Sequence, residues 1–442
     1  MTTPIPEIVL AIDFSLDTLD TSLRDDSKEW MWMHHAHKNN WPGFQELKRD
    51  LLVELNQHDP VKLIIAGEST GPYWHHAFYQ FSHDEELRPF SPELALHNPA
   101  HIKGYRRSLP ERDKADPEDA RLIDQYHRAY GVKHPYQFCD RYARLRTYSR
   151  AYSRVIHSLA SEKAYLLSVL YLWASEYVRE KKREEMPFSD RLGATSMYIL
   201  DEFTDIHAVA NIPLPELTEL LKQRSHNSFR EPESNARRLH QVARHSYPIP
   251  EPEADATHQV IHHTLAHIRM LSDNQSAYRQ LIEQELDTLP EAKLALDFKG
   301  LGSILVAGCL SEIQDTSRFV TGNKFDRRRQ EYRPRTYRDG QAAVAKLAGL
   351  WWPKRDSGRV QGIQPHLARE RNPHLRYWLV QAAHTLRMSQ PEYAQFYRKK
   401  YREATSHHHK RAIVLTARKA VRLIFALLHK GRQTALQEGL LT

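Results

Sequence analysis

A chain of 442 residues is longer than one hydrophobic core normally serves, so its length predicts two or three domains. Lysine and arginine number 63 against 55 acidic residues, a formal charge of +8 that favours nucleic acid, before a membrane surface, as partner. Cys139 and Cys309 lie too far apart for a CxxC zinc site or a disulfide framework, which favours a reducing cytoplasm. The sequence lacks both an apolar run of about 18 residues and a basic–apolar leader, so we expect no membrane span and no signal peptide.

The N-terminal part has the pattern of a mixed α/β sheet. Residues 8–13 are an apolar run ending in Asp13, which predicts a buried strand, and residues 18–23 and 30–34 predict two more strands in an antiparallel meander. Residues 42–55 have helical spacing, residues 61–68 and 93–97 predict further strands, and residues 100–107 predict a helix. Sites in such sheets form at the carboxyl ends of strands, where Asp13 and Glu68 stand.

Residues 114–121 hold two aspartates three positions apart, Asp116 and Asp119, at the expected start of a helix. Both carboxylates project from one helical face, and a cation between them would relieve their repulsion. A solvated helix start with a capping aspartate explains the segment as well. If this helix crosses the same end of the sheet, Asp13 and Glu68 join the pair, and four carboxylates suit two hard divalent cations about 3.5–4 Å apart.

These motifs resemble those of the DEDD transposases of bacterial insertion sequences, which are related to the Piv DNA invertase. The matching segments are residues 11–13, 68–74, 98–103 and 114–121. The resemblance implies a ribonuclease H-like (RuvC-like) mixed-sheet catalytic domain over residues 1–135. It also implies a metal-binding catalytic tetrad of Asp13, Glu68, Asp116 and Asp119, with two Mg²⁺ per active site and Mn²⁺ as a substitute. Pro117-Glu118 stands where many relatives have arginine and an apolar residue, which leaves the carboxylates in place.

From Arg141 the chain becomes helical, basic and aromatic. Arginines that include Arg144 and Arg150 alternate with tyrosines, a composition that can hold phosphates and stack on bases. An amphipathic helix with a solvated basic face is an equal alternative.

The next stretch contains a proline-rich segment and a long helix. Residues 231–254 carry four prolines and predict a loop or boundary. Residues 258–289 predict a long helix with a coiled-coil-like apolar seam. Packing within one subunit would explain the seam, but the resemblance favours a dimer interface. Histidines 262, 263 and 267 are expected to be solvated, because no HExxH pattern accompanies them. We expect residues 136–290 to form a helical linker with a small subdomain and a coiled coil.

The C-terminal part, residues 291–442, is expected to be a mainly helical, all-α transposase domain. Residues 298–310 contain Gly-Leu-Gly, typical of a helix–hairpin–helix whose free N–H groups hold a phosphate, although a plain tight turn would have the same pattern. Residues 318–338 are rich in arginine and predict salt-sensitive binding to a nucleic-acid backbone. The nucleic-acid contacts expected across the chain are Lys299, Gly300, Gly302, Arg327, Arg328, Arg329, Arg333, Arg335, Arg144 and Arg150.

Residues 347–358 extend the resemblance, because Gly349-Leu350, Pro353 and Ser357-Gly358 occur in the family's order. The serine of that pattern is the family's nucleophile, and the resemblance assigns this role to Ser357. Without the resemblance, Ser357 would be an ordinary loop serine. A hydroxyl attacking phosphorus needs deprotonation and charge neutralisation, which metal ions can supply.

The resemblance, from Ile8 to Arg432, implies a DNA transposase or site-specific recombinase that works through a phosphoserine intermediate. It further implies donor and target DNA, a structured guide (bridge) RNA, a homodimer or homotetramer, no membrane, and a cytoplasmic, nucleoid-associated location. The alternative is a RuvC-type metal-dependent, structure-specific DNA endonuclease with water as nucleophile and Ser357 as a bystander. A non-catalytic nucleic-acid-binding protein is a third possibility, which the four carboxylates disfavour.

Overall fold

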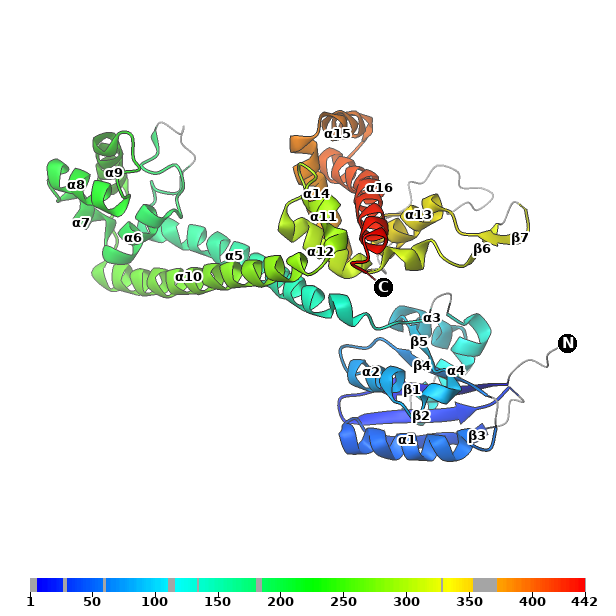
Figure 1. Cartoon of the computed structure of the whole chain (residues 1–442). Helices are drawn as coiled ribbons and strands as arrows, with labels where there is room; N and C mark the ends of the chain where they lie inside the picture. Colours follow the sequence, from blue (N-terminus) through cyan, green and yellow to red (C-terminus); the bar gives the residue numbers. More distant parts are fainter. Residues whose placement is uncertain are drawn as a thin grey trace. The chain divides into compact units, whose positions relative to one another are not determined.

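The computed structural model describes residues 6–26, 30–58, 61–109, 116–132, 135–179, 185–326, 329–352 and 372–441 (Figure 1). Contacts divide the chain into two compact units, Met1–Asp140 and Arg141–Thr442. The predicted boundary after residue 135 lies close to this division. The predicted boundary after residue 290 lies inside the second unit and stays a prediction.

The first unit contains a five-stranded mixed sheet in the order β3-β2-β1-β4-β5. β1 (Glu7–Phe14), β2 (Thr18–Arg24) and β3 (Trp30–Lys38) form the predicted antiparallel meander. β4 (Lys62–Glu68) pairs in parallel with β1, and β5 (Glu93–His97) pairs in parallel with β4. The mixed α/β sheet expected from the sequence is therefore confirmed.

Helices cover both faces of this sheet, which explains why β1 and β4 are apolar at nearly every position. Even-numbered β1 residues such as Leu10 pack with α1 (Trp41–Leu55) and α2 (His75–His83). Odd-numbered residues such as Ala11 pack with α3 (Pro99–Ser108) and α4 (Asp116–Tyr130). The single-turn helix η1 (Arg88–Phe90) precedes β5. A second one, η2 (Asp140–Tyr142), spans the boundary between the two units.

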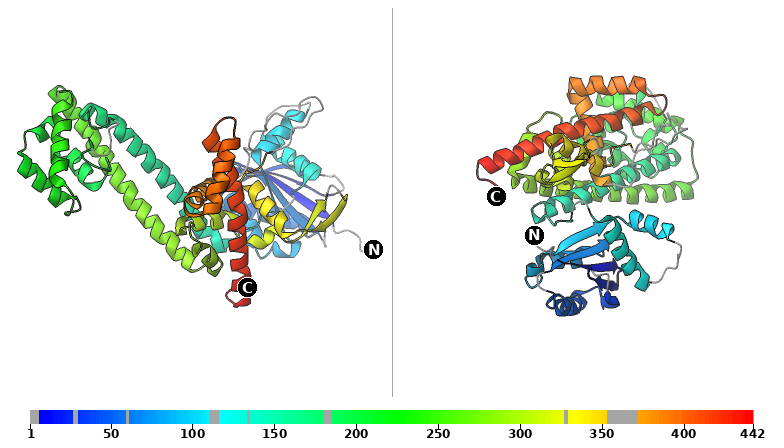
Figure 2. Two further views of the ribbon diagram at one scale, coloured as in Figure 1. Left: turned by 90° about the horizontal axis from the view of Figure 1, so that it is seen from above. Right: turned by 90° about the vertical axis from the view of Figure 1, so that its right-hand side faces the viewer.

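The second unit begins with two long helices that pack side by side, α5 (Ala143–Trp173) and α10 (Glu251–Asp287) (Figure 2). Between them in sequence lie α6 (Ala194–Glu202), α7 (Ile206–Ala210), α8 (Leu214–Arg224) and α9 (Pro232–His245). Seam residues Ile261, Leu265 and Ile268 of α10 are buried in one core with Leu166 and Leu170 of α5. Packing within one subunit therefore buries this part of the predicted seam.

The predicted loop over residues 231–254 is wrong for most of its length. Residues 232–245 form α9, and α10 begins at Glu251 rather than at residue 258. In both helices a proline occupies the first turn, where its missing N–H has no helical partner and causes no loss. Apart from Glu231, the N-cap of α9, only the short connection over residues 246–250 is non-helical.

The remainder of the second unit is mainly helical, as predicted. Its segments are η4 (Pro290–Ala292), α11 (Lys293–Leu296), α12 (Ser303–Ile313), η5 (Thr316–Phe319), β6 (Asn323–Asp326), β7 (Glu331–Pro334), α13 (Tyr337–Leu347), α14 (Pro373–Ser389), α15 (Pro391–Glu403) and α16 (His408–Gln437). α14, α15 and α16 pack on one another, and α12 packs on α5 and α14. Among the helices of the described residues, none has the length and apolar character that crossing a bilayer requires.

Candidate active site and nucleic-acid surface

Asp13 and Glu68 stand at the carboxyl ends of two adjacent parallel strands. The register pairs Ile12 of β1 with Gly67 of β4, so Asp13 and Glu68 are the next residue on each strand. Neighbouring strands lie about 4.8 Å apart, and side chains in register point to the same face. Both residues are half-buried, and the Thr70 hydroxyl donates a hydrogen bond to Glu68 Oε1. The two carboxylates therefore occupy one edge of the sheet together.

The same sheet face is the one that α4 covers. Side chains alternate along a strand, so Asp13 shares the face of Val9 and Ala11, which pack against Leu122 of α4. Since α4 begins at Asp116, the other two aspartates of the predicted tetrad belong to the helix that covers this face of the sheet.

The two aspartates of α4 differ in what the structure describes. Asp119 lies in the first turn, is partly buried, and forms an ion pair with Arg106 of α3. The side chain of Asp116 lies outside the described residues. Arg106 was not singled out from the sequence, because its pairing with Asp119 depends on the packing of α3 against α4.

This edge has the ligand chemistry that hard divalent cations prefer, namely carboxylate oxygens on neighbouring elements. Among the residues with described side chains, no three His, Cys, Asp or Glu groups are arranged as a preformed metal cluster. Asp13 and Glu68 nevertheless fit such an ion as a pair on one face. Arg106 supplies positive charge to Asp119, the charge complement that a metal would also provide.

A buried imidazole pair lies next to Glu68. His97 ends β5 in register with Glu68, and its Nε2 lies 3.2 Å from Nδ1 of His127 on α4. Burial lowers the pKa of His97 to about 4, with a further contribution from His127, and burial also lowers the pKa of His127. The pair is therefore neutral at physiological pH and connects β5 to α4.

Ser357 lies outside the described residues, but the residues that flank residues 353–371 are held together. The backbone N–H of Asn372 donates to the carbonyl of Leu347 at 3.0 Å. Arg376 Nε donates to the carbonyl of Ala348 at 2.9 Å. The end of α13 and the start of α14 are thus joined directly.

Glu312 supports this junction from α12. Its carboxylate accepts hydrogen bonds from Arg150 Nε at 2.7 Å and Nη2 at 2.9 Å, and from Asn372 Nδ2 at 2.6 Å. Burial would raise the pKa of Glu312, but the hydrogen bonds from Arg150 and Asn372 lower it overall. Glu312 is not among the site residues predicted from the sequence. A lone carboxylate in the apolar run 303–313 is nevertheless a signal of a buried, paired charge.

The Gly-Leu-Gly segment forms a tight turn between α11 and α12. Gly300 has φ +103°, and a Cβ at this position would lie 2.1 Å from the Ser389 hydroxyl of α14. The close approach of α14 and the positive φ therefore explain why position 300 is a glycine. Lys299 is exposed, and Gly302, also exposed, is the N-cap of α12, with open space where a Cβ would point.

The predicted arginines differ in how strongly acidic side chains hold them. Arg150 donates two hydrogen bonds to the carboxylate of Glu312. The largely exposed Arg144 forms an ion pair with Glu285, with 3.3 Å between Nε and Oε2. Arg333 of β7 binds Asp339. Arg329 is exposed between β6 and β7, and Arg335, directly after β7, is half-buried. Arg327 and Arg328 lie outside the described residues.

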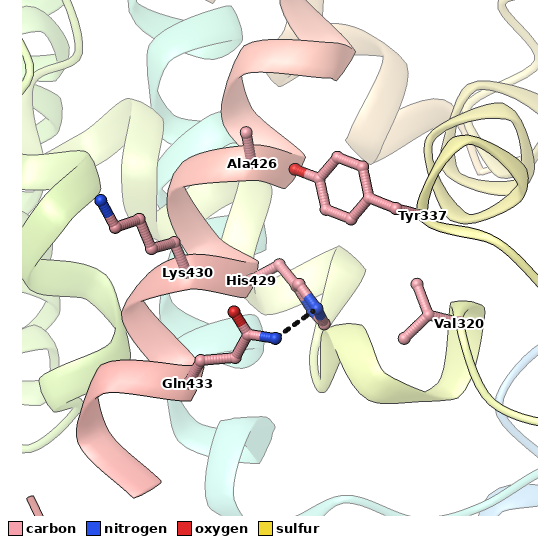
Figure 3. Close-up of a pocket in the computed structure, with 6 residues that line it drawn as sticks. All are labelled: Val320, Tyr337, Ala426, His429, Lys430 and Gln433. Atoms are coloured by element: carbon pink, nitrogen blue, oxygen red, sulfur yellow. Dashed lines mark hydrogen bonds between the residues drawn. The ribbon is translucent and has the colours of Figure 1, made fainter. Parts of the chain in front are cut away.

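A hollow of about 590 Å³ between α13 and α16 contains none of the predicted site residues (Figure 3). Tyr337 and His429 face it, with Lys430 and Gln433 on the α16 side. His429 Nδ1 lies 3.1 Å from the Thr316 hydroxyl, and burial lowers the pKa of this imidazole. None of the residues that line the hollow is a carboxylate, and its one charged side chain is Lys430.

Comparisons with known proteins identify relatives of both ends of the chain. A transposase family model for DEDD enzymes of the IS110 type matches residues 10–173, and a model described as "Transposase IS116/IS110/IS902 family" matches residues 333–398. The pilin gene-inverting proteins of Moraxella bovis and Moraxella lacunata are each 29% identical over 118 residues, 26% of this chain. Each match spans 33% of the relative's own length. The resemblance stated from the sequence motifs is confirmed.

Proposed function

From the premise that this chain is a relative of the IS110-type DEDD transposases, we propose that it is a DNA transposase or recombinase of an insertion sequence. The observation that carries the proposal is the position of Asp13 and Glu68, in register on the sheet face that α4 covers. The sheet order β3-β2-β1-β4-β5, with three antiparallel strands and two parallel ones, supports a ribonuclease H-like (RuvC-like) catalytic domain. The name of the pilin gene-inverting proteins is consistent with a DNA rearrangement.

Asp13, Glu68, Asp116 and Asp119 would hold the metal, with Mg²⁺ as the expected ion and Mn²⁺ as a substitute. When bound, the metal would neutralise charge at the scissile phosphate. The Ser357 hydroxyl attacks the phosphorus and loses its proton, a bond forms between the serine oxygen and phosphorus, and the bond to the DNA 3′ oxygen breaks. The 3′ oxygen takes up a proton and leaves as a hydroxyl, which can later attack the phosphoserine for strand exchange.

The proposed partners follow from the same premise. They are donor and target DNA, a structured guide RNA that reads sequence by base pairing, and one or three further copies of this chain. The excess of basic residues supports polyanionic partners. The proposed location is the cytoplasm, with the nucleoid.

The test is a trap for the covalent intermediate. The protein is purified with RNA transcribed from its own flanking DNA, mixed with Mg²⁺ and DNA labelled at its ends, and denatured. Label should remain on the protein, and it should disappear in Ser357→Ala and in Asp13→Asn. Ser228→Ala, which changes an exposed serine of the second unit, serves as the control and should keep the label. Cleaved DNA without protein-bound label would mean that water is the nucleophile, as in a RuvC-type endonuclease.

A further inference from the structure

The hairpin of β6 and β7 stands on the surface of the second unit with an unusual division of its side chains. The register pairs Lys324 with Arg333 and Phe325 with Tyr332. Paired residues share a face, and neighbours along a strand point to opposite faces. One face of the ribbon therefore carries the two basic side chains, and the other carries the two aromatic rings.

The basic face is bound to the protein through one buried carboxylate. Asp339 of α13 receives hydrogen bonds from Lys324 Nζ at 2.6 Å and from Arg333 Nη1 at 2.7 Å. The same carboxylate accepts from the backbone N–H of Thr336 at 2.9 Å in a capping box, so α13 itself holds it in place. Hydrogen bonding from Arg333, with those from Lys324 and Thr336, holds the pKa of Asp339 far below its usual range. The ribbon is therefore anchored through charges.

The aromatic face points to solvent. Tyr332 is 74% exposed and Phe325 is 40% exposed. Their rings contact each other edge to face, with centroids 5.2 Å apart. Soluble proteins usually bury aromatic rings, so two exposed rings side by side on a short ribbon are unusual. Two rings held at fixed positions on an anchored ribbon form a surface suited to a flat, apolar partner group.

Charge indicates what that partner is. Residues 323–335 contain six basic residues and two acidic ones, and Asp339 binds two of the basic residues. The segment that carries the rings therefore has a net positive charge in its sequence, as expected for a site that binds a polyanion with flat apolar groups. We propose that Phe325 and Tyr332 form a stacking platform for unpaired nucleobases of a single-stranded or looped nucleic acid. Arg329, an exposed arginine between the two strands, would contact an adjoining phosphate.

This inference rests on the proposed function only in taking the partner to be nucleic acid. It adds that the ribbon reads base planes in addition to phosphate charge, so it favours unpaired segments over a closed duplex. Stacking tolerates every base, because each base has a π face, and the platform is therefore expected to bind without sequence preference.

The experiment compares two labelled probes of equal length and charge by fluorescence anisotropy with the full-length protein. One is a strand of thymidines, and the other is an abasic strand with the same phosphates. Tyr332→Leu keeps an apolar side chain against Phe325 but removes a π face. It should weaken binding of the thymidine strand roughly tenfold and leave binding of the abasic strand unchanged. The dependence of the binding constant on salt concentration should stay the same, because no phosphate contact is lost. Tyr332→Trp should retain binding.

The control is Tyr247→Leu, which removes a tyrosine of similar exposure, 71%, from the connection between α9 and α10. It should leave binding of both strands unchanged. Unfolding curves of all variants show whether the Tyr332→Leu substitution disturbs the ribbon, and Phe325→Leu provides a second, independent removal of a ring.

Equal losses on both probes, or no loss on either, would overturn the platform. A change in subunit number in Tyr332→Leu would identify the rings as a contact between copies of the chain instead. If the unaltered protein bound neither probe, the nucleic-acid part of the proposed function would fail as well. If Tyr332→Leu binds both strands as tightly as the unaltered protein, the stacking platform is wrong but the proposed function is unaffected.

Discussion

His97 and Asp124 are ionisable side chains buried between the sheet and α4, beside the candidate active site. Asp124 is fully buried and binds Arg24 of β2 at 3.3 Å and Arg128 at 2.9 Å. A carboxylate with two guanidinium partners can remain charged inside a protein, whereas His97 pairs with the His127 imidazole and stays neutral. Both contacts hold α4, and with it Asp119, on the sheet.

The neutral imidazole pair predicts that the first unit loses stability in mild acid. Below pH 6.5 the unfolded chain protonates its histidines, but folded His97, with a pKa of about 4, does not. The unfolded state then binds more protons, so the free energy of unfolding should fall as the pH drops from about 6.5 to about 4, by on the order of 3 kcal/mol. Thermal unfolding of the protein at pH 7, 6 and 5 measures this, and His97→Gln should flatten the decline.

The matched control for this measurement is His58→Gln, which changes an exposed histidine of the same unit. The His58 imidazole faces solvent in the folded chain, as it does in the unfolded chain, so its removal should leave the pH dependence of stability as it is. An equally steep decline in His97→Gln and in the unaltered protein would show that the buried pair does not control the acid response.

At the scale of elements, three helices of the second unit meet at Glu312. α12 provides this carboxylate, α5 provides Arg150, and α14 provides Asn372 at its N-cap. Asn372 also donates its backbone N–H to the end of α13, on the other side of the segment that carries Ser357. The cluster therefore fixes the position from which the proposed nucleophile's segment departs.

We predict that Glu312→Gln lowers formation of the protein–DNA link more than its effect on stability explains. Loss of the charge leaves Arg150 without a carboxylate and weakens the hold on Asn372, at a cost of about 1–3 kcal/mol in the free energy of unfolding. The covalent trap measures the yield of linked DNA, and thermal unfolding measures the stability of the same preparation.

Glu291→Gln is the control for that comparison. Glu291 is just as buried and binds Arg141 of the same second unit through two hydrogen bonds of 3.0 and 2.9 Å, with a third from Tyr142. It supports η4 and α16 rather than the start of α14. If both variants reduce the link in proportion to lost stability, Glu312 has no special role in positioning the segment.

The elements that the sequence predicts well are those with a local signal. Apolar runs give β1, β4 and β5, and the strand-end carboxylates follow from them without knowledge of packing. The arginine content of residues 318–338 did not predict the hairpin of β6 and β7, because its short strands have one aromatic residue each and no apolar alternation. Its strands depend on Asp339, which lies in a different element.

In the candidate site, too, some residues could be predicted from the sequence and others could not. Asp13 and Glu68 could be predicted because each stands near the end of an apolar strand. Their position on the face that α4 covers follows from the strand pairing and from the alternation of side chains along a strand. Arg106 and Glu312 could not be assigned partners from the sequence. Their ion pairs join elements whose approach depends on tertiary packing, and no local pattern encodes it.

At the scale of the whole molecule, the proposed chemistry is shared between two compact units. The four carboxylates belong to residues 1–140, with their own sheet and two packed faces, and Ser357 belongs to residues 141–442. A chain divided in this way can bring the two sets of groups to one phosphate within a subunit or between subunits of a dimer. Only the second arrangement requires a second copy for catalysis.

Mixing two inactive variants distinguishes these arrangements, and we predict that the mixture is active. Asp13→Asn and Ser357→Ala are each expected to abolish the protein–DNA link alone. If Asp13 of one subunit acts with Ser357 of the other, half of the randomly reassembled dimers are mixed and each has one intact site, so about a quarter of the activity returns. If both groups act within one subunit, every site stays defective and nothing returns. The link yield is measured after co-expression, and a double variant mixed with the same Ser357→Ala protein, which can form no intact site, is the control.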